Sequence, residues 1–338
     1  MSSKTSKNSE NLRLLIIQIP CLNEEHQLPD ALADLPRTVP GFDRVEWLII
    51  DDGSTDRTVE VAHRLGADHV ISHGANRGLA AAFMTGLEHS LRLGADVIVN
   101  TDADNQYCAA DIPALTRLIV DNQSDLVIGE RPIAQIKEFS PSKKVLQRLG
   151  TKVVRAFSGV DVRDAPSGFR ALSREAALRL RVFSRYTYTM ETLVQAGWEG
   201  LRVNSVEVGV NPKSRESRLV KSIPRYVFRS AVTIIRTFAL YRPFRFFVIL
   251  GSPFFALGLL LMVRWCLYFF LAENYGSRLP SLLIALGSLA LSMQFLVVAL
   301  VADLLAASRR LAADQLYLQR RSALGVRPTE FPEDGRHF

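Results

Sequence analysis

Residues 14–25 read LLIIQIPCLNEE, an apolar run that ends abruptly in polar residues. Short apolar runs of this kind recur along the chain, and segments with the apolar spacing of helices separate them. The predicted strands cover residues 14–19, 47–50, 97–99 and 126–128, and the predicted helices cover residues 24–35, 55–65, 79–93 and 111–122. Strands that are apolar throughout are typical of parallel sheets buried on both faces. The sequence therefore predicts an α/β domain with an open, mostly parallel sheet.

Polar side chains gather where the predicted strands end. The strand ends read PCLNEE (residues 20–25), DDGSTD (51–56), NRG (76–78), TDADNQ (101–106) and GER (129–131). Helix capping explains a single acidic strand end, and Ser54 and Asp56 fit that role, while Asp51 fits a turn-stabilising one. In open α/β sheets, ligands bind beyond the carboxyl ends of the strands. Several acidic ends together therefore predict a cation and a polar ligand at this edge.

The run Asp102-Ala103-Asp104 is the predicted metal site. Carboxylates one residue apart at a strand end can both face a hard divalent ion, and Gln106 can add an amide oxygen. No Gly-x-Gly-x-x-Gly follows the first strand and no Gly-x-x-x-x-Gly-Lys occurs, which argues against a dinucleotide or P-loop site. The sequence therefore predicts that Mg²⁺ or Mn²⁺ holds the phosphates of a ligand.

Residues 246–302 are mostly apolar, whereas the first 245 residues have the composition of a soluble protein. Within them, residues 246–271 are interrupted only by Arg264, and residues 280–302 carry no charge. About 20 apolar residues suffice to cross a bilayer core, so both segments qualify as spans. The short connection predicts a transmembrane hairpin; two buried helices of a soluble core are the alternative. Arg264 is interpreted as functional, as paired with a residue such as Glu273, or as reaching outward to the interface.

Charge orients the predicted hairpin. Arginines precede the first span and follow the second, while the loop between the spans holds only Glu273 and Arg278. By the positive-inside rule, both termini and the catalytic domain are expected on the cytoplasmic side of a two-span membrane protein. The flanking arginines are Arg242, Arg245, Arg309, Arg310, Arg320 and Arg321.

Residues 218–245 have the pattern of a basic amphipathic helix. At 100° per residue, one narrow arc carries all the cations of the first part of this segment. These are Arg218, Lys221, Arg225, Arg229 and Arg236. Beside a span, the pattern favours a helix in the membrane interface, with packing on the soluble domain as the alternative. The net charge of +7 is therefore attributed to a membrane surface or a phosphate-rich ligand, and no nucleic-acid partner is expected.

The motifs together resemble those of family 2 glycosyltransferases with the GT-A fold, over residues 12–219. The shared motifs are PCLNEE, IIDDGSTD, NRGLAAAFMTG, DADNQY and SGFR. The chain most resembles the branch of dolichol-phosphate mannose synthases and bacterial polyprenyl-phosphate glycosyltransferases. The features that carry this resemblance are DADNQY, YTYTMETLVQA, the later RESRL and the C-terminal hairpin. The resemblance implies a Rossmann-like GT-A domain over residues 12–217. The rest of the expected organisation is a disordered tail (1–11), the interfacial helix region (218–245), the hairpin (246–302) and a cytoplasmic tail (303–338).

The resemblance also implies which residues bind the nucleotide-sugar donor. Asp102, Asp104 and Gln106 match the metal ligands of the mannose synthases. Asp104 is accordingly a predicted catalytic residue, and Asp102 a predicted donor contact as well. The residues expected to contact the nucleoside or phosphates are Pro20, Leu22, Glu24, Asp52 and Arg131.

The acceptor side follows from the same resemblance. Glu191, a predicted catalytic residue, matches the acidic residue in the helix that faces the sugar and acceptor; a buried structural acid paired with an arginine such as Arg170 is the alternative. Arg215, Ser217 and Arg218 match a basic loop that closes over phosphates, and Arg131 matches a separate arginine near the phosphates; ordinary lipid-facing cations are the alternative for Arg215 and Arg218. Asn105 departs from the family pattern, which has an apolar residue there.

The expected reaction is an inverting transfer of a hexose from a UDP- or GDP-sugar to a polyprenyl phosphate. One alternative is a glycolipid synthase that transfers sugar to a lipid hydroxyl, which requires a general base. Another is a non-catalytic membrane scaffold with a degenerate transferase domain. A processive polysaccharide synthase is disfavoured, because its Gln-x-x-Arg-Trp signature is absent and the predicted spans are few. A homo-oligomer is left open, and no His residue is given a role.

Overall fold

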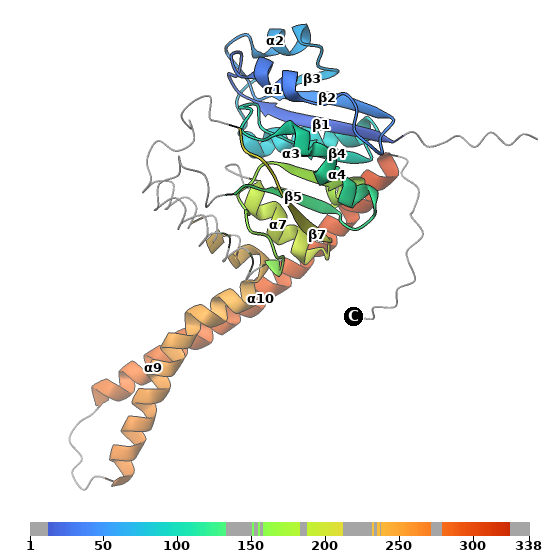
Figure 1. Ribbon diagram of the computed structural model, residues 1–338. Helices are drawn as coiled ribbons and strands as arrows, with labels where there is room; N and C mark the ends of the chain where they lie inside the picture. The colour runs from blue at the N-terminus through green and yellow to red at the C-terminus, as the bar shows by residue number, and fades with distance from the viewer. Residues whose placement is uncertain are drawn as a thin grey trace, which may run out of the picture. The chain divides into compact units, whose positions relative to one another are not determined.

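A computed structural model describes residues 13–132, 158–182, 188–211, 238–271 and 279–324, with single positions 151, 155, 232, 235 and 236 (Figure 1). The predicted tail (1–11), most of the predicted interfacial helix (218–245) and the loop between the spans lie outside these residues. So do Arg215, Ser217 and Arg218. The structure falls into two compact units, residues 1–230 with 317–338, and residues 231–316.

The first unit is built around a mixed sheet whose strands run in the order β3-β2-β1-β4-β6-β5-β7. Strands β1 to β4 are mutually parallel, and β7 is parallel to β5. Strand β6 is antiparallel to both of its neighbours, β4 and β5. The bounds are β1 Leu14–Cys21, β2 Arg44–Asp51, β3 His69–Ser72, β4 Val97–Asn100, β5 Leu126–Glu130, β6 Arg170–Ser173 and β7 Val203–Glu207. The predicted mostly parallel α/β sheet is confirmed, and β3, β6 and β7 are additions to the four strands whose residues the sequence predicts.

Helices connect the strands, as the spacing predicts. They are α1 Leu28–Asp34, α2 Thr58–Arg64, α3 Leu79–Arg92, η1 Ala109–Asp111, α4 Ile112–Val120, α6 Arg174–Arg179 and α7 Thr189–Trp198. Helix α2 begins three residues later than expected, and just before it the Asp56 carboxylate accepts from the Thr58 backbone N–H at 3.0 Å. Ser54 has a different function: its hydroxyl accepts from the Asn23 backbone N–H at 2.8 Å, which joins the ends of β1 and β2.

Strand β1 lies at the centre of the parallel part of the sheet and is buried along its whole length. Its side chains pack with those of β2 and β4 in one core, in which Leu15, Ile17 and Ile49 are fully buried. Burial of a side chain of this size contributes about 1.5–3 kcal/mol. The apolar run at residues 14–19 therefore forms the strand whose carboxyl end is at the middle of the predicted ligand-binding edge.

The second unit consists mainly of α9 (Pro243–Leu271) and the apolar part of α10 (Leu279–Ala323). Both are long and apolar enough to cross a membrane, and only 11% of each apolar window is buried. This exposure is unlike that of core helices in a soluble protein. Helix α10 continues past residue 302, where the predicted span ends, and its last residues belong to the first unit.

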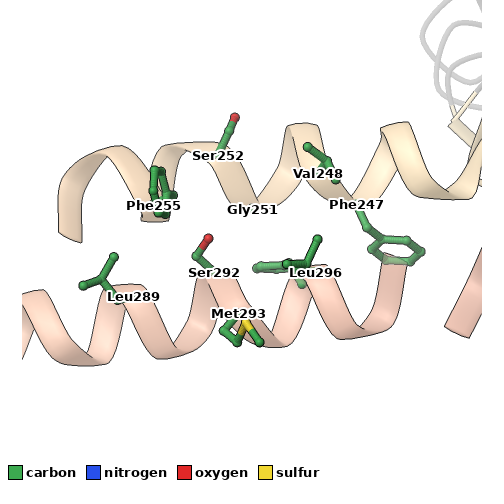
Figure 2. A pocket seen from close by; sticks show the side chains of 10 residues that line it. Phe247, Val248, Gly251, Ser252, Phe255, Leu289, Ser292, Met293 and Leu296 are labelled. Atoms are coloured by element: carbon green, nitrogen blue, oxygen red, sulfur yellow. The ribbon is translucent and has the colours of Figure 1, made fainter. Parts of the chain in front are cut away.

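Helices α9 and α10 pack against each other through small residues. A Cβ on Gly251 would lie 2.9 Å from Phe295, and one on Gly258 would lie 2.8 Å from Leu289. An apolar groove of about 400 Å³ lies between the two helices and is lined in part by Phe255 and Met293. Figure 2 shows the side chains that line it. These contacts form the hairpin that the sequence predicts.

Candidate active site

Asp102 and Asp104 follow β4, whose neighbours in the sheet are β1 and β6. Asp102 lies against the backbone of Gly168. A Cβ added to Gly168 would lie 3.0 Å from Asp102 Oδ2 and 3.1 Å from Asp102 Oδ1. Loss of solvent, together with the charge of Asp104, raises the pKa of Asp102 to about 7, and Arg131 and Arg170 oppose this rise. The two carboxylates thus repel each other, and Asp102 is poorly solvated.

The turn after Asp104 explains the unusual Asn105. Its backbone has φ 53°, in the left-handed region that asparagine adopts more readily than apolar residues do. Its side chain donates to Asp34 Oδ2 at 2.8 Å. The next residue, Gln106, donates its backbone N–H to Asp104 Oδ1 at 3.2 Å. The departure from the family pattern therefore serves the turn that positions Asp104.

A buried hydrogen-bond network lies beneath the two carboxylates, and sequence reasoning did not identify it. Asn100 accepts from Gln18 at 2.9 Å and donates to Gly168 O at 2.9 Å and to Tyr188 Oη at 2.8 Å. Tyr107 Oη accepts from the Gly168 backbone N–H at 2.9 Å. In the sequence, Gln18 and Asn100 could have indicated this network, because each is a polar residue inside an apolar strand. The network fixes the backbone on which Asp102 rests.

Replacement of Gly168 with alanine is expected to weaken Mn²⁺ binding about 10- to 100-fold, the range seen when groups supporting metal ligands are changed. The added methyl would meet both Asp102 oxygens and Tyr188 Oη, each within 3.1 Å, and would push the carboxylate from its position. Titration of the full chain with Mn²⁺, followed by electron paramagnetic resonance, measures the effect. Gly287→Ala is the control, because nothing lies within 4 Å of its added Cβ. Equal Mn²⁺ affinity of the Gly168→Ala and wild-type proteins would contradict this arrangement.

Arg131, which the sequence places near the phosphates, is bound by Asp164. Its Nε donates to Oδ2 at 2.7 Å and its Nη2 to Oδ1 at 3.0 Å. Burial lowers the pKa of Arg131, but Tyr107 and Asp164 together raise it above its ordinary value. The guanidinium is thus a permanently charged, paired group at the end of β5.

Arg170 is fully buried at the start of β6. Its guanidinium donates to Thr192 Oγ1 at 2.6 Å, to Ser167 O at 2.5 Å and to Thr189 O at 3.2 Å. These contacts join β6 to the first turn of α7, which carries the buried Glu191. Arg170 therefore positions the helix that the sequence assigns to the sugar and acceptor.

The predicted nucleoside-binding residues at the end of β1 occupy a tightly connected loop. Pro20 is buried in β1, Leu22 is half-buried, and Glu24 is buried with its backbone N–H donating to Thr58 Oγ1 at 2.8 Å. Asn23 lies in the left-handed region at φ 55° and accepts from the Thr55 backbone N–H at 2.8 Å. The end of β1 is therefore held to the end of β2.

Asp52, the remaining predicted nucleoside contact, is engaged by the protein itself. Its Oδ1 meets His73 Nδ1 at 2.8 Å and accepts from the Arg77 backbone N–H at 2.9 Å. Its Oδ2 accepts from the Gly78 backbone N–H at 2.8 Å. Asp51 accepts from the Ser54 backbone N–H at 3.0 Å, as expected of a turn-stabilising residue. His73 is a site residue that sequence reasoning missed.

Within the part of the chain that the structure describes, no three His, Cys, Asp or Glu side chains form a metal site. The two carboxylates after β4 are thus an incomplete ligand set, which suits an ion whose remaining positions are filled by water or phosphate oxygens. Chemically, this edge can accept a polar, anionic ligand and a divalent cation.

Comparison with known proteins gives three relevant similarities. Residues 16–181 match the family model described as Glycosyl transferase family 2. The UDP-N-acetylglucosamine–dolichyl-phosphate N-acetylglucosaminyltransferase of Methanococcus voltae is 30% identical over 221 residues, which cover 58% of this chain and 85% of that protein. The polyprenol monophosphomannose synthase of Mycolicibacterium smegmatis is 34% identical over 48% of this chain and 62% of its own length.

Among solved structures, glucosyl-3-phosphoglycerate synthase from Mycobacterium tuberculosis, in complex with Mn²⁺, UDP and glucosyl-3-phosphoglycerate, has a similar fold. The TM-score is 0.52 at 21% sequence identity, over 66% of this chain and 80% of that one. This likeness confirms the predicted GT-A-like architecture of the sheet domain.

Proposed function

Because the chain belongs to glycosyl transferase family 2, we propose that it transfers a hexose from a nucleotide sugar to a polyprenyl phosphate, with inversion at C1. The observation that carries this proposal is the pair Asp102 and Asp104 at a strand end, in a chain that also has two apolar helices long enough to cross a membrane. The names of the relatives from Methanococcus voltae and Mycolicibacterium smegmatis support a lipid-phosphate acceptor.

The donor set fits a divalent cation. Asp102 and Asp104 provide two hard carboxylates, their repulsion favours a bound cation, and Gln106 follows in the same turn. These three residues would hold Mg²⁺ or Mn²⁺, which would offset charge developing on the leaving diphosphate. Pro20, Leu22, Glu24 and Asp52 would line the nucleoside pocket, and Arg131, paired with Asp164, would lie near the phosphates.

The acceptor requires positioning more than it requires a strong base. A phosphate monoester has its second pKa near 6, so the attacking oxygen is largely ionised at neutral pH. Glu191, buried in α7, would orient a sugar hydroxyl or the acceptor. Arg215, Ser217 and Arg218 would neutralise the lipid phosphate, with the catalytic domain and both termini on the cytoplasmic side of the membrane.

The test is a panel of UDP- and GDP-sugars offered to the purified full chain with undecaprenyl or dolichyl phosphate. A lipid product heavier by one hexose or N-acetylhexosamine is expected, detected by mass spectrometry, and it should disappear when EDTA removes the metal. The corresponding free polyprenol is the control, because it lacks the ionised nucleophile. Transfer to polyprenol but not to its phosphate would favour the glycolipid synthase. A chain that binds no nucleotide sugar with Mg²⁺ or Mn²⁺ would favour the scaffold.

A further inference from the structure

His73 connects the ends of three neighbouring strands. It is buried just after β3, and its backbone N–H donates to Asp51 O of β2 at 2.8 Å. Its Nδ1 lies 2.8 Å from Asp52 Oδ1, and its Nε2 lies 3.0 Å from Thr85 Oγ1. The Asp52 backbone N–H in turn donates to Cys21 O of β1 at 2.8 Å. An ionised carboxylate only accepts, so Nδ1 donates the hydrogen bond to Asp52.

Through Asp52, the same contact holds the turn that leads into α3. The carboxylate accepts from the backbone N–H groups of Arg77 and Gly78, at 2.9 and 2.8 Å. Gly53 packs closely against this turn: a Cβ there would lie 2.7 Å from Ala75 C. The Asp52 carboxylate therefore holds the turn through two backbone N–H groups, and Gly53 packs closely against the backbone of the turn. A shift of the turn would disturb both the hydrogen bonds and this packing.

Arg77 is the exposed cation on this turn. Arg131 is paired with Asp164, and the guanidinium of Arg170 is taken up by Ser167, Thr189 and Thr192. Among the residues that the structure describes, none forms a hydrogen bond or ion pair with the Arg77 guanidinium. The Arg77 guanidinium is therefore available to bind an anionic ligand at the edge of the sheet where the strands end.

We propose that His73 is a positioning residue of the donor site, which acts through Asp52 to hold the turn that presents Arg77 to the anionic donor. This inference rests on the proposed function, because it takes the donor to be a nucleotide sugar. It adds support of the turn to the nucleoside contact predicted for Asp52. His73 itself touches no substrate.

Three substitutions at His73 separate positioning from general stability. Asparagine can place an amide N–H near the position of Nδ1 and so keep the bond to Asp52, whereas glutamine reaches the position of Nε2 and alanine reaches neither. The measurement is calorimetric binding of UDP and GDP to the full chain with Mn²⁺, with donor KM and kcat from the transfer assay. His73→Ala and His73→Gln are expected to bind the preferred nucleotide about tenfold more weakly, as for loss of one hydrogen bond to a charged group.

The remaining variants complete the pattern. His73→Asn is expected to bind within about threefold of the wild type, and donor KM should change in the weakened variants while kcat does not. Arg77→Ala is expected to weaken binding at an unchanged melting temperature, since its side chain is exposed. His69→Ala is the matched control: His69 begins β3, the strand that His73 follows, and it also contacts an acid, Glu46, at 2.9 Å. It should bind nucleotide normally.

The outcomes distinguish this inference from the proposed function. A wild-type chain that binds neither UDP nor GDP overturns the proposed function and this inference with it. Normal nucleotide binding by His73→Gln or Arg77→Ala, with a wild type that binds, overturns this inference alone. Equal weakening by asparagine and glutamine also overturns it, because the bond to Asp52 would then not matter.

Discussion

Replacing Asp104 with alanine is expected to lower sugar transfer about a thousandfold or more, while the protein stays folded. Metal ions typically stabilise the transition state by several kcal/mol, and each 1.36 kcal/mol corresponds to about a tenfold change in rate. Asp104 is half-exposed at the end of β4 and outside the sheet core, so its loss should cost little stability. The measurements are product formation by mass spectrometry and thermal unfolding of the same preparation.

Asp121→Ala is the matched control for this prediction. Asp121 is a surface acid at the end of α4, and its contact with Arg117 at 3.5 Å is an exposed ion pair worth about 1 kcal/mol or less. Transfer by this variant should equal that of the wild type. The buffers are treated with EDTA and then supplied with Mg²⁺. If Asp104→Ala turned over near the wild-type rate under these conditions, the assignment of Asp104 as a metal ligand would be wrong.

Replacing Arg170 with leucine is expected to lower the free energy of unfolding of the sheet domain by about 3 kcal/mol or more, because each buried acceptor left without a donor costs about 1–3 kcal/mol. The side chain is fully buried, and Ser167 O, Thr189 O and Thr192 Oγ1 would all lose its N–H groups. Chemical denaturation of the full chain in detergent, followed by tryptophan fluorescence, measures the change. Transfer should fall as well, since α7 carries Glu191.

The control for the stability prediction is Arg92→Leu. Arg92 is exposed at the end of α3 and pairs with Glu88 at 2.6 Å, one turn earlier in the helix. Pairs of this kind contribute about 0.3–0.5 kcal/mol, so the two variants should differ severalfold in their cost. If Arg170→Leu cost no more than Arg92→Leu, the bonds from Arg170 to α7 would have little importance for stability.

The sheet and much of the edge were predictable because their signals are local. A continuous apolar run predicts a buried strand without knowledge of its partners, and residues directly after such a strand must lie at its carboxyl end. The position of Asp102 and Asp104 follows from that reasoning. The antiparallel strand β6 was not predictable in the same way, because its four residues pair with β4 and β5, which lie far away in sequence.

The sequence by itself determined the fold class, the family, the strand-end acids and the two membrane-length helices, since each depends on short-range pattern or on residue identity. Only the tertiary structure decided which polar groups are already used by the protein. Asp52 supports a turn 25 residues away, Arg131 is taken up by Asp164 33 residues away, and Asn100 meets Tyr188 88 residues away. The physical reason is that a hydrogen bond requires its partners within about 3 Å, and separations of this kind are set by packing rather than by local sequence.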